Sequence, residues 1–115
     1  MGTDVNSKRR RKRIDPAIQA HIQELRNERP FSGFTDDGAE PPYRLRILGR
    51  GELAFYEERG RALLFELIAG RGLIFTKTMR LWDDGYAVTD EDRKRIAGRI
   101  EAYLRSKGAD SVTIV

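Results

Sequence analysis

The chain contains no cysteine, a single histidine and four prolines in 115 residues. The absence of cysteine excludes disulfide bridges, thiol nucleophiles and Cys-ligated metal sites. No apolar run approaches the roughly 18 residues that a membrane-spanning helix requires, and no apolar stretch follows the N-terminal charges as in a secretory signal. These absences favour a soluble, cytoplasmic protein that binds no membrane.

Positive charge is concentrated at one end of the chain. The net charge is +4, and the first 30 residues hold eight Lys or Arg against four Asp or Glu, whereas fourteen of each sign follow. The excess lies in an unbroken basic run: Lys8, Arg9, Arg10, Arg11, Lys12 and Arg13. Such a run repels itself and has nothing to bury, which predicts a disordered basic tail over residues 1–13.

A helix is predicted to begin directly after the tail. Asp15 is suited to accept hydrogen bonds from free backbone N–H groups, and Pro16 suits the first helical position. Pro30 ends the helix, and a stretch rich in Gly, Asp and Pro follows, so residues 14–42 are interpreted as a helix and a linker. An apolar stripe recurs at helical spacing within it: Ile18, His21, Ile22 and Leu25.

From Tyr43 the apolar period changes to two, which is typical of β-strands. Segments 43–47, 52–57 and 73–82 show this alternation, 62–68 is nearly all apolar apart from Glu66, and tight turns that contain glycine separate the four. They predict a four-stranded antiparallel meander, with 62–68 as a central strand covered on both faces. Lys77 interrupts the apolar face of the last segment, which allows a twist or bulge there.

The C-terminal helix has the clearest signals. Thr89 and Asp92 predict a reciprocal cap, Gly108 predicts the helix end, and Arg99 is expected on the solvent face. Residues 111–115 are β-prone and predict a short final strand. The expected fold is therefore α+β: an N-terminal helix, the meander, a C-terminal helix packed on the sheet, and a last strand, with 43–115 as the globular domain. The buried stripe of the helix is predicted to be Ile96, Ala97, Ile100, Tyr103 and Leu104.

The sequence shows no motif that would make the chain an enzyme. A nucleophile elbow, a phosphate-binding loop and a zinc helix motif are all missing, and a lone histidine is a poor catalyst. Five carboxylates crowd residues 83–92, but their spacing fits no calcium loop, because Gly85 falls where a ligand is needed. We therefore expect no catalytic residues, no cofactor and no metal, and a protein that acts by binding.

Two surfaces are candidates for that binding. Trp82 and Tyr86 flank an acidic turn, and Trp, Tyr and Arg dominate interface hot spots. The predicted protein-binding residues are Asp83, Asp84, Tyr86 and Asp90. The alternative is nucleic acid held by the basic run Lys8, Arg9, Arg10, Arg11, Lys12 and Arg13, although no aromatic residue interleaves that run to stack on bases.

Over residues 50–115 the chain resembles the bacterial proteins grouped as immunity protein family 74. The resemblance rests on Arg80-Leu81-Trp82-Asp83 at the end of a strand and on Val88-Thr89-Asp90-Glu91-Asp92-Arg93-Lys94-Arg95-Ile96 at the start of the helix. It implies a non-enzymatic protein that binds and neutralises a cognate toxin domain. The basic tail and the first helix lie outside the matching region.

Overall fold

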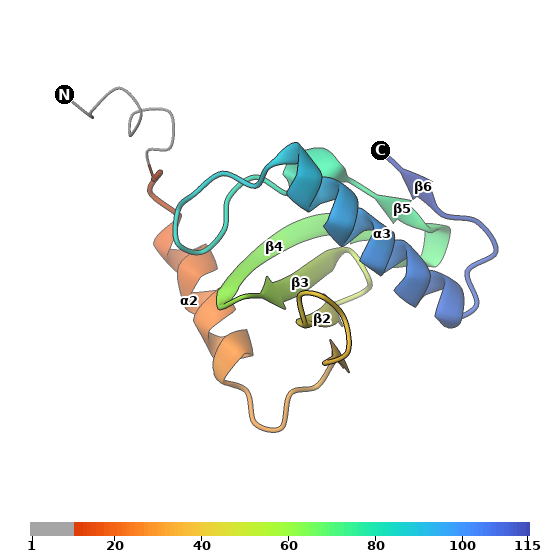
Figure 1. Ribbon diagram of the computed structural model, residues 1–115, viewed down its shortest axis with the longest axis horizontal. Coiled ribbons are helices and arrows are strands. Elements are labelled where there is room, and N and C mark those ends of the chain that lie inside the picture. Colours follow the sequence, from red (N-terminus) through yellow and green to blue (C-terminus); the bar gives the residue numbers. More distant parts are fainter. Residues whose placement is uncertain (1–10) are drawn as a thin grey trace.

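The structure is a computed structural model that describes residues 11–115 of the chain. This part is an α+β fold in which two helices, α2 (Pro16–Asn27) and α3 (Asp90–Ser106), lie against a six-stranded sheet (Figure 1). The first five strands pair antiparallel, and the last runs parallel to its neighbour. In sheet order, which is also chain order, they are β1 (Phe34–Asp36), β2 (Tyr43–Leu48), β3 (Leu53–Glu58), β4 (Arg61–Ile68), β5 (Leu73–Ile74) and β6 (Thr113–Ile114).

Helix α2 begins where the sequence predicts. The Asp15 carboxylate accepts a hydrogen bond from the Ala17 N–H at 2.8 Å, and Pro16 stands in the first turn. Ile22 and Leu25 of the apolar stripe are buried, but Ile18 keeps 45% of its surface exposed. The first turn of α2 therefore leaves an aliphatic side chain uncovered.

Helix α3 confirms its predicted caps. Thr89 Oγ1 accepts from the Asp92 N–H, and the Asp92 carboxylate accepts from the Thr89 N–H in return. Gly108, at a φ of +103°, follows the helix end, where the Ala109 N–H bonds to the Leu104 carbonyl at 3.0 Å. The buried residues are Ile96, Ala97, Ile100 and Leu104, as the stripe predicts, whereas Tyr103 is partly buried at the edge of the core.

Two apolar clusters lie on opposite faces of the sheet, because neighbouring residues in a strand point to opposite sides. The larger joins β2, β3 and β4 to α3, and Tyr56 lies at its centre between Leu45 and Leu63 of the adjacent strands. The smaller cluster lies against α2: Ile22, Leu25, Phe55 and Ala62. Strand β4 contributes to both clusters, as predicted for a central strand.

The prediction of a strand over residues 73–82 is wrong for most of its length. Strand β5 ends at Ile74, and a 3₁₀ turn over Thr76–Thr78 follows. The Thr78 hydroxyl explains the break, since it accepts from the Glu66 N–H at 2.9 Å and donates to the Phe75 carbonyl at 2.7 Å. The Thr78 side chain thereby takes the place of a backbone carbonyl as the hydrogen-bond partner of β4. The chain then leaves the sheet as a long loop that includes a single bridge, Leu81 to Ala87.

The segment predicted to be a linker also differs from expectation. Within it, β1 pairs with β2, so that Phe34 lies opposite Leu45 and Asp36 opposite Tyr43. The Phe34 ring lies 6.0 Å from the Tyr43 ring and 5.4 Å from the Tyr103 ring, between centroids. Strand β1 is too short to show a period of two in the sequence, and aromatic contacts of this kind help to hold it on the sheet.

We predict that Ile100→Ala lowers the free energy of unfolding by about 2–5 kcal/mol, the usual result of truncating a fully buried aliphatic side chain. The matched control on the same helix is Gly98→Ala, because Gly98 is exposed and a Cβ there meets nothing within 4 Å. That control should raise stability by about 0.5–1 kcal/mol, since alanine restricts the unfolded chain. Urea denaturation measures both. Equal losses from the two variants would contradict the assigned buried face.

Candidate functional site

A buried carboxylate joins the sheet to α3. Glu58 is 4% exposed and accepts two hydrogen bonds from Arg95, at 2.7 and 3.1 Å, and one from the Tyr56 hydroxyl at 2.6 Å. Arg99 donates to the Tyr56 oxygen at 2.9 Å and lies 3.8 Å from Glu58. This closed network holds the Glu58 carboxylate as a counter-ion to two arginines, which makes it a structural group.

The network corrects the expectation for Arg99 and sets the protonation of its neighbours. Arg99 does not lie on the solvent face, since its side chain is only 15% exposed. Burial, helped by the adjacent Glu58 carboxylate, raises the pKa of the Tyr56 phenol, so the hydroxyl remains a donor.

Burial alone would raise the pKa of Asp92, but hydrogen bonds from Arg95, the Thr89 backbone and Trp82 outweigh it and lower that pKa. Asp92 therefore stabilises the fold above its usual pKa range, and that contribution is lost as the pH falls through the lowered value.

Two of the predicted partner-binding acids are engaged inside the protein. Asp83 accepts from Arg26 of α2 at 2.5 Å and from the Ala62 N–H of β4 at 3.0 Å. Asp84 lies 2.9 Å from Arg61 and also accepts from the Tyr86 N–H at 3.0 Å. Both charges are paired, so the turn offers a partner less negative potential than the sequence suggests.

Tyr86 and Asp90 are the more accessible members of that predicted set. Tyr86 is 40% exposed, and the Arg11 guanidinium lies 5.9 Å from its ring centroid. The Asp90 side chain is 94% exposed, although Arg93 lies 2.9 Å away. The structure thus brings Asp83, Asp84 and Tyr86 together in one loop and leaves Asp90 at the start of α3.

The described end of the basic run is packed against the same loop. The Lys12 N–H donates to the Gly85 carbonyl at 2.8 Å. Gly85 has a φ of +89°, and a Cβ there would meet the Lys12 carbonyl oxygen at 2.6 Å, so the close approach requires glycine. Lys8, Arg9 and Arg10 lie outside the described residues, whereas Arg11, Lys12 and Arg13 are held beside the loop.

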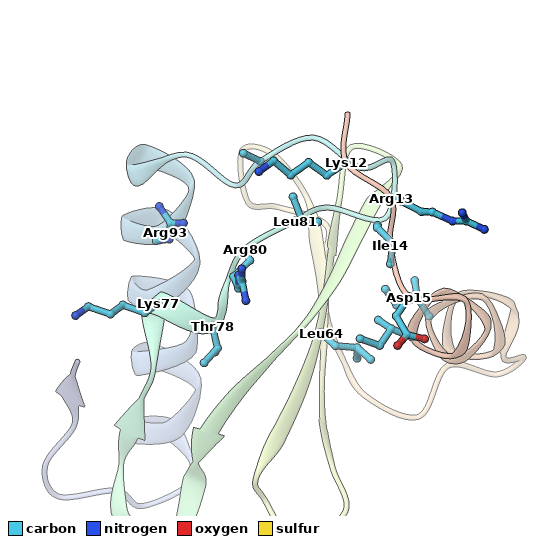
Figure 2. A pocket seen from close by; sticks show the side chains of 13 residues that line it. Lys12, Arg13, Ile14, Asp15, Leu64, Lys77, Thr78, Arg80, Leu81 and Arg93 are labelled. Carbon is cyan, nitrogen blue, oxygen red and sulfur yellow. The ribbon is translucent and has the colours of Figure 1, made fainter. Parts of the chain in front are cut away.

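A groove of about 570 Å³ opens on the other side of this segment, and we call it the cationic groove. One wall is residues 12–18, at the start of α2, and the other is residues 77–81 with α3 beyond them (Figure 2). Lys12 extends across its top in this view, while Arg13 and Lys77 project outward on opposite sides. The charged side chains that line it are five cations, Lys12, Arg13, Lys77, Arg80 and Arg93, and one carboxylate, Asp15, which caps α2.

Four of these five cations lack an acidic partner within the described part of the chain. Among residues 11–115, no carboxylate lies within 4.0 Å of the charged nitrogens of Lys12, Arg13, Lys77 or Arg80. Arg93 is held by Asp90 and donates to the Thr76 and Met79 carbonyls, so it supports the wall. The groove is therefore a place where unpaired positive charge gathers.

The cationic groove was only partly visible in the sequence. The basic run gave Lys12 and Arg13, but Lys77 and Arg80 come from the segment that was expected to be a strand. A usable signal was Lys77 itself, a charge that breaks an apolar alternation. Ile18 gave no such signal, because its position in the stripe predicts burial, whereas the structure leaves it 45% exposed.

Other kinds of site find no support in residues 11–115. No three His, Asp or Glu side chains in this range come together as metal ligands. Neither described helix combines the length and the apolar character needed to cross a membrane. Comparison of the chain with protein-family models, curated proteins and solved structures finds no match. The similarity to immunity protein family 74 stays a prediction.

We predict that Glu58→Ala lowers the free energy of unfolding by roughly 3 kcal/mol, because two arginines and a buried phenol lose their acceptor. The control is Glu101→Ala, which removes a partly exposed ion pair with Arg105 at 3.0 Å and should change stability by less than about 0.5 kcal/mol. Chemical denaturation of both variants provides the comparison. A loss at Glu58 no larger than at Glu101 would show that the network is not structural.

Proposed function

We propose that the chain is a non-enzymatic binding module that holds the sugar–phosphate backbone of a nucleic acid in the cationic groove. The observation that carries the proposal is the gathering of Lys12, Arg13, Lys77 and Arg80 around one groove without acidic partners among the described residues. Phosphates would supply the missing negative charges. Each cation that pairs with a phosphate releases a counter-ion, which is the main source of affinity in such complexes.

Several arginines elsewhere among residues 11–115 are engaged in ion pairs, although exposed cations without one, such as Arg50 and Arg71, also lie outside the groove. Arg26 and Arg44 share Glu57, Arg46 pairs with Glu28, and Arg95 pairs with Glu58. The charges of those arginines are neutralised by ion pairs within the fold, so they are not available to a ligand. The groove cations are free of such contacts within residues 11–115, so their field reaches the solvent.

The sequence carries further positive charge directly before the first residues of the groove. Lys8, Arg9 and Arg10 directly precede Arg11 in the chain, and the Lys12 backbone is fixed to Gly85 beside the groove. A ligand whose charge repeats along its length can engage the groove and the basic run together. A nucleic acid has this property, since it carries one phosphate per nucleotide.

We predict that Lys77→Gln combined with Arg80→Gln weakens oligonucleotide binding and flattens its salt dependence. If both cations pair with phosphates, the slope of log affinity against log salt should fall by roughly 1.4 for a single strand, about 0.7 for each lost contact. Fluorescence anisotropy of a labelled oligonucleotide over a range of salt concentrations gives the slope.

The matched control removes two exposed arginines from turns outside the groove, Arg50→Gln with Arg71→Gln. It has the same net charge as the groove variant and should keep most of the wild-type slope. Equal losses of slope in both variants would mean that the whole surface, and not the groove, attracts the nucleic acid.

Binding of a protein partner through the acidic loop is a second candidate, favoured by the exposure of Tyr86 and Asp90 and by the immunity-protein resemblance. We predict that, in this case, Tyr86→Ala with Asp90→Asn weakens the complex at least about tenfold, or roughly 1.4 kcal/mol. Asp83 is not a suitable test position, because it holds Arg26 and β4. Calorimetric titration of a partner isolated from the native lysate is the measurement, with circular dichroism as the folding control. Unchanged affinity in the folded variant would reject the loop.

A further inference from the structure

The floor of the cationic groove is aliphatic. Its apolar residues come from segment 12–22, from β4 and from the loop after β5, and among them Ile18 is 45% exposed. Leu64 and Leu81 are half-buried, while Ala87 is exposed. Water therefore reaches an aliphatic surface that the fold leaves uncovered, directly beside the unpaired cations.

This combination matches a ligand with two chemically different parts. The cationic rim favours an anionic group, and the apolar floor favours an apolar part of the ligand whose transfer from water is favourable. A nucleotide joins a phosphate to a flat base at a fixed separation, and the groove volume of about 570 Å³ lies in the range of small-molecule pockets. An unbroken acidic peptide would satisfy the rim but leave the floor empty.

We infer that the groove accepts an unpaired nucleobase on its aliphatic floor while the adjoining phosphates meet Lys12, Lys77 and Arg80. This inference rests on the proposed function and specifies its substrate class, which is single-stranded nucleic acid. In a duplex the bases are stacked and paired inside the helix, so its phosphates can reach the rim but its bases cannot reach the floor. Aliphatic side chains offer no hydrogen bonds to base edges, so recognition is tolerant of sequence.

The expected gain per base is modest. The aromatic platforms of other single-strand binders contribute about 1–3 kcal/mol per base, and no aromatic residue lines the described groove. An aliphatic floor should contribute less. We expect a short oligothymidylate to bind about three- to tenfold more tightly than an abasic strand with the same number of phosphates.

The test compares three fluorescent probes at one salt concentration: the oligothymidylate, the abasic strand and a hairpin duplex. The floor variant is Ile18→Ala, which keeps a good helix former and changes no charge. Its matched control is Ile114→Ala, because Ile114 is 48% exposed and does not line the groove. The floor variant should abolish the advantage of the oligothymidylate and leave the abasic affinity unchanged, whereas the control should bind all three probes like the wild type.

The outcomes separate this inference from the proposed function. Equal affinity of the wild type for the oligothymidylate and the abasic strand, or tighter binding of the duplex, would overturn the inference and leave backbone binding standing. No binding of any probe would overturn both. Displacement of the oligothymidylate by polyglutamate at equal charge concentration would assign the groove to an acidic protein and also overturn the inference.

Discussion

Asp83 makes the contacts that hold the two walls of the cationic groove in place. Its carboxylate binds Arg26 of α2 and the Ala62 N–H of β4, and its own N–H donates to the Ala62 carbonyl at 2.7 Å. Gln19 of α2 donates to the Asp83 carbonyl at 3.3 Å. One residue thereby joins the first helix, the central strand and the loop after β5. A largely buried carboxylate with several donors is a rigid junction, and the groove lies between the elements that it connects.

Pairing of charges inside the fold determines which charges remain for a ligand. Two neighbouring carboxylates of β3 hold arginines on opposite faces of the sheet: Glu57 pairs with Arg26 and Arg44, and Glu58 with Arg95 and Arg99. Residues 31–115 are neutral in sum, yet four cations without acidic partners among residues 11–115 lie around the groove beside the first helix, and the basic run precedes that helix in the chain. A neutral total charge is therefore compatible with a local positive field that attracts an anionic polymer.

Local signals in the sequence were sufficient for much of the fold. The caps at Asp15 and Thr89, the alternation in β2 and β3 and the apolar run of β4 each depend on residues a few positions apart. The groove depends on distant ones: Ile18, Leu64 and Arg80 meet only after folding. The role of Asp83 was equally hidden, because its partner Arg26 lies 57 residues away. The fourth predicted strand failed since a threonine side chain replaced a backbone partner, which alternation cannot reveal.

If a nucleic acid occupies the cationic groove, its contacts can be mapped on the ¹⁵N-labelled protein. Amide chemical shifts would be followed by nuclear magnetic resonance while a short single-stranded oligonucleotide is added at low salt. We expect the largest changes at residues 12–18, Leu64 and residues 77–81. Changes confined to Tyr86 and the start of α3, or spread evenly over the surface, would contradict this expectation.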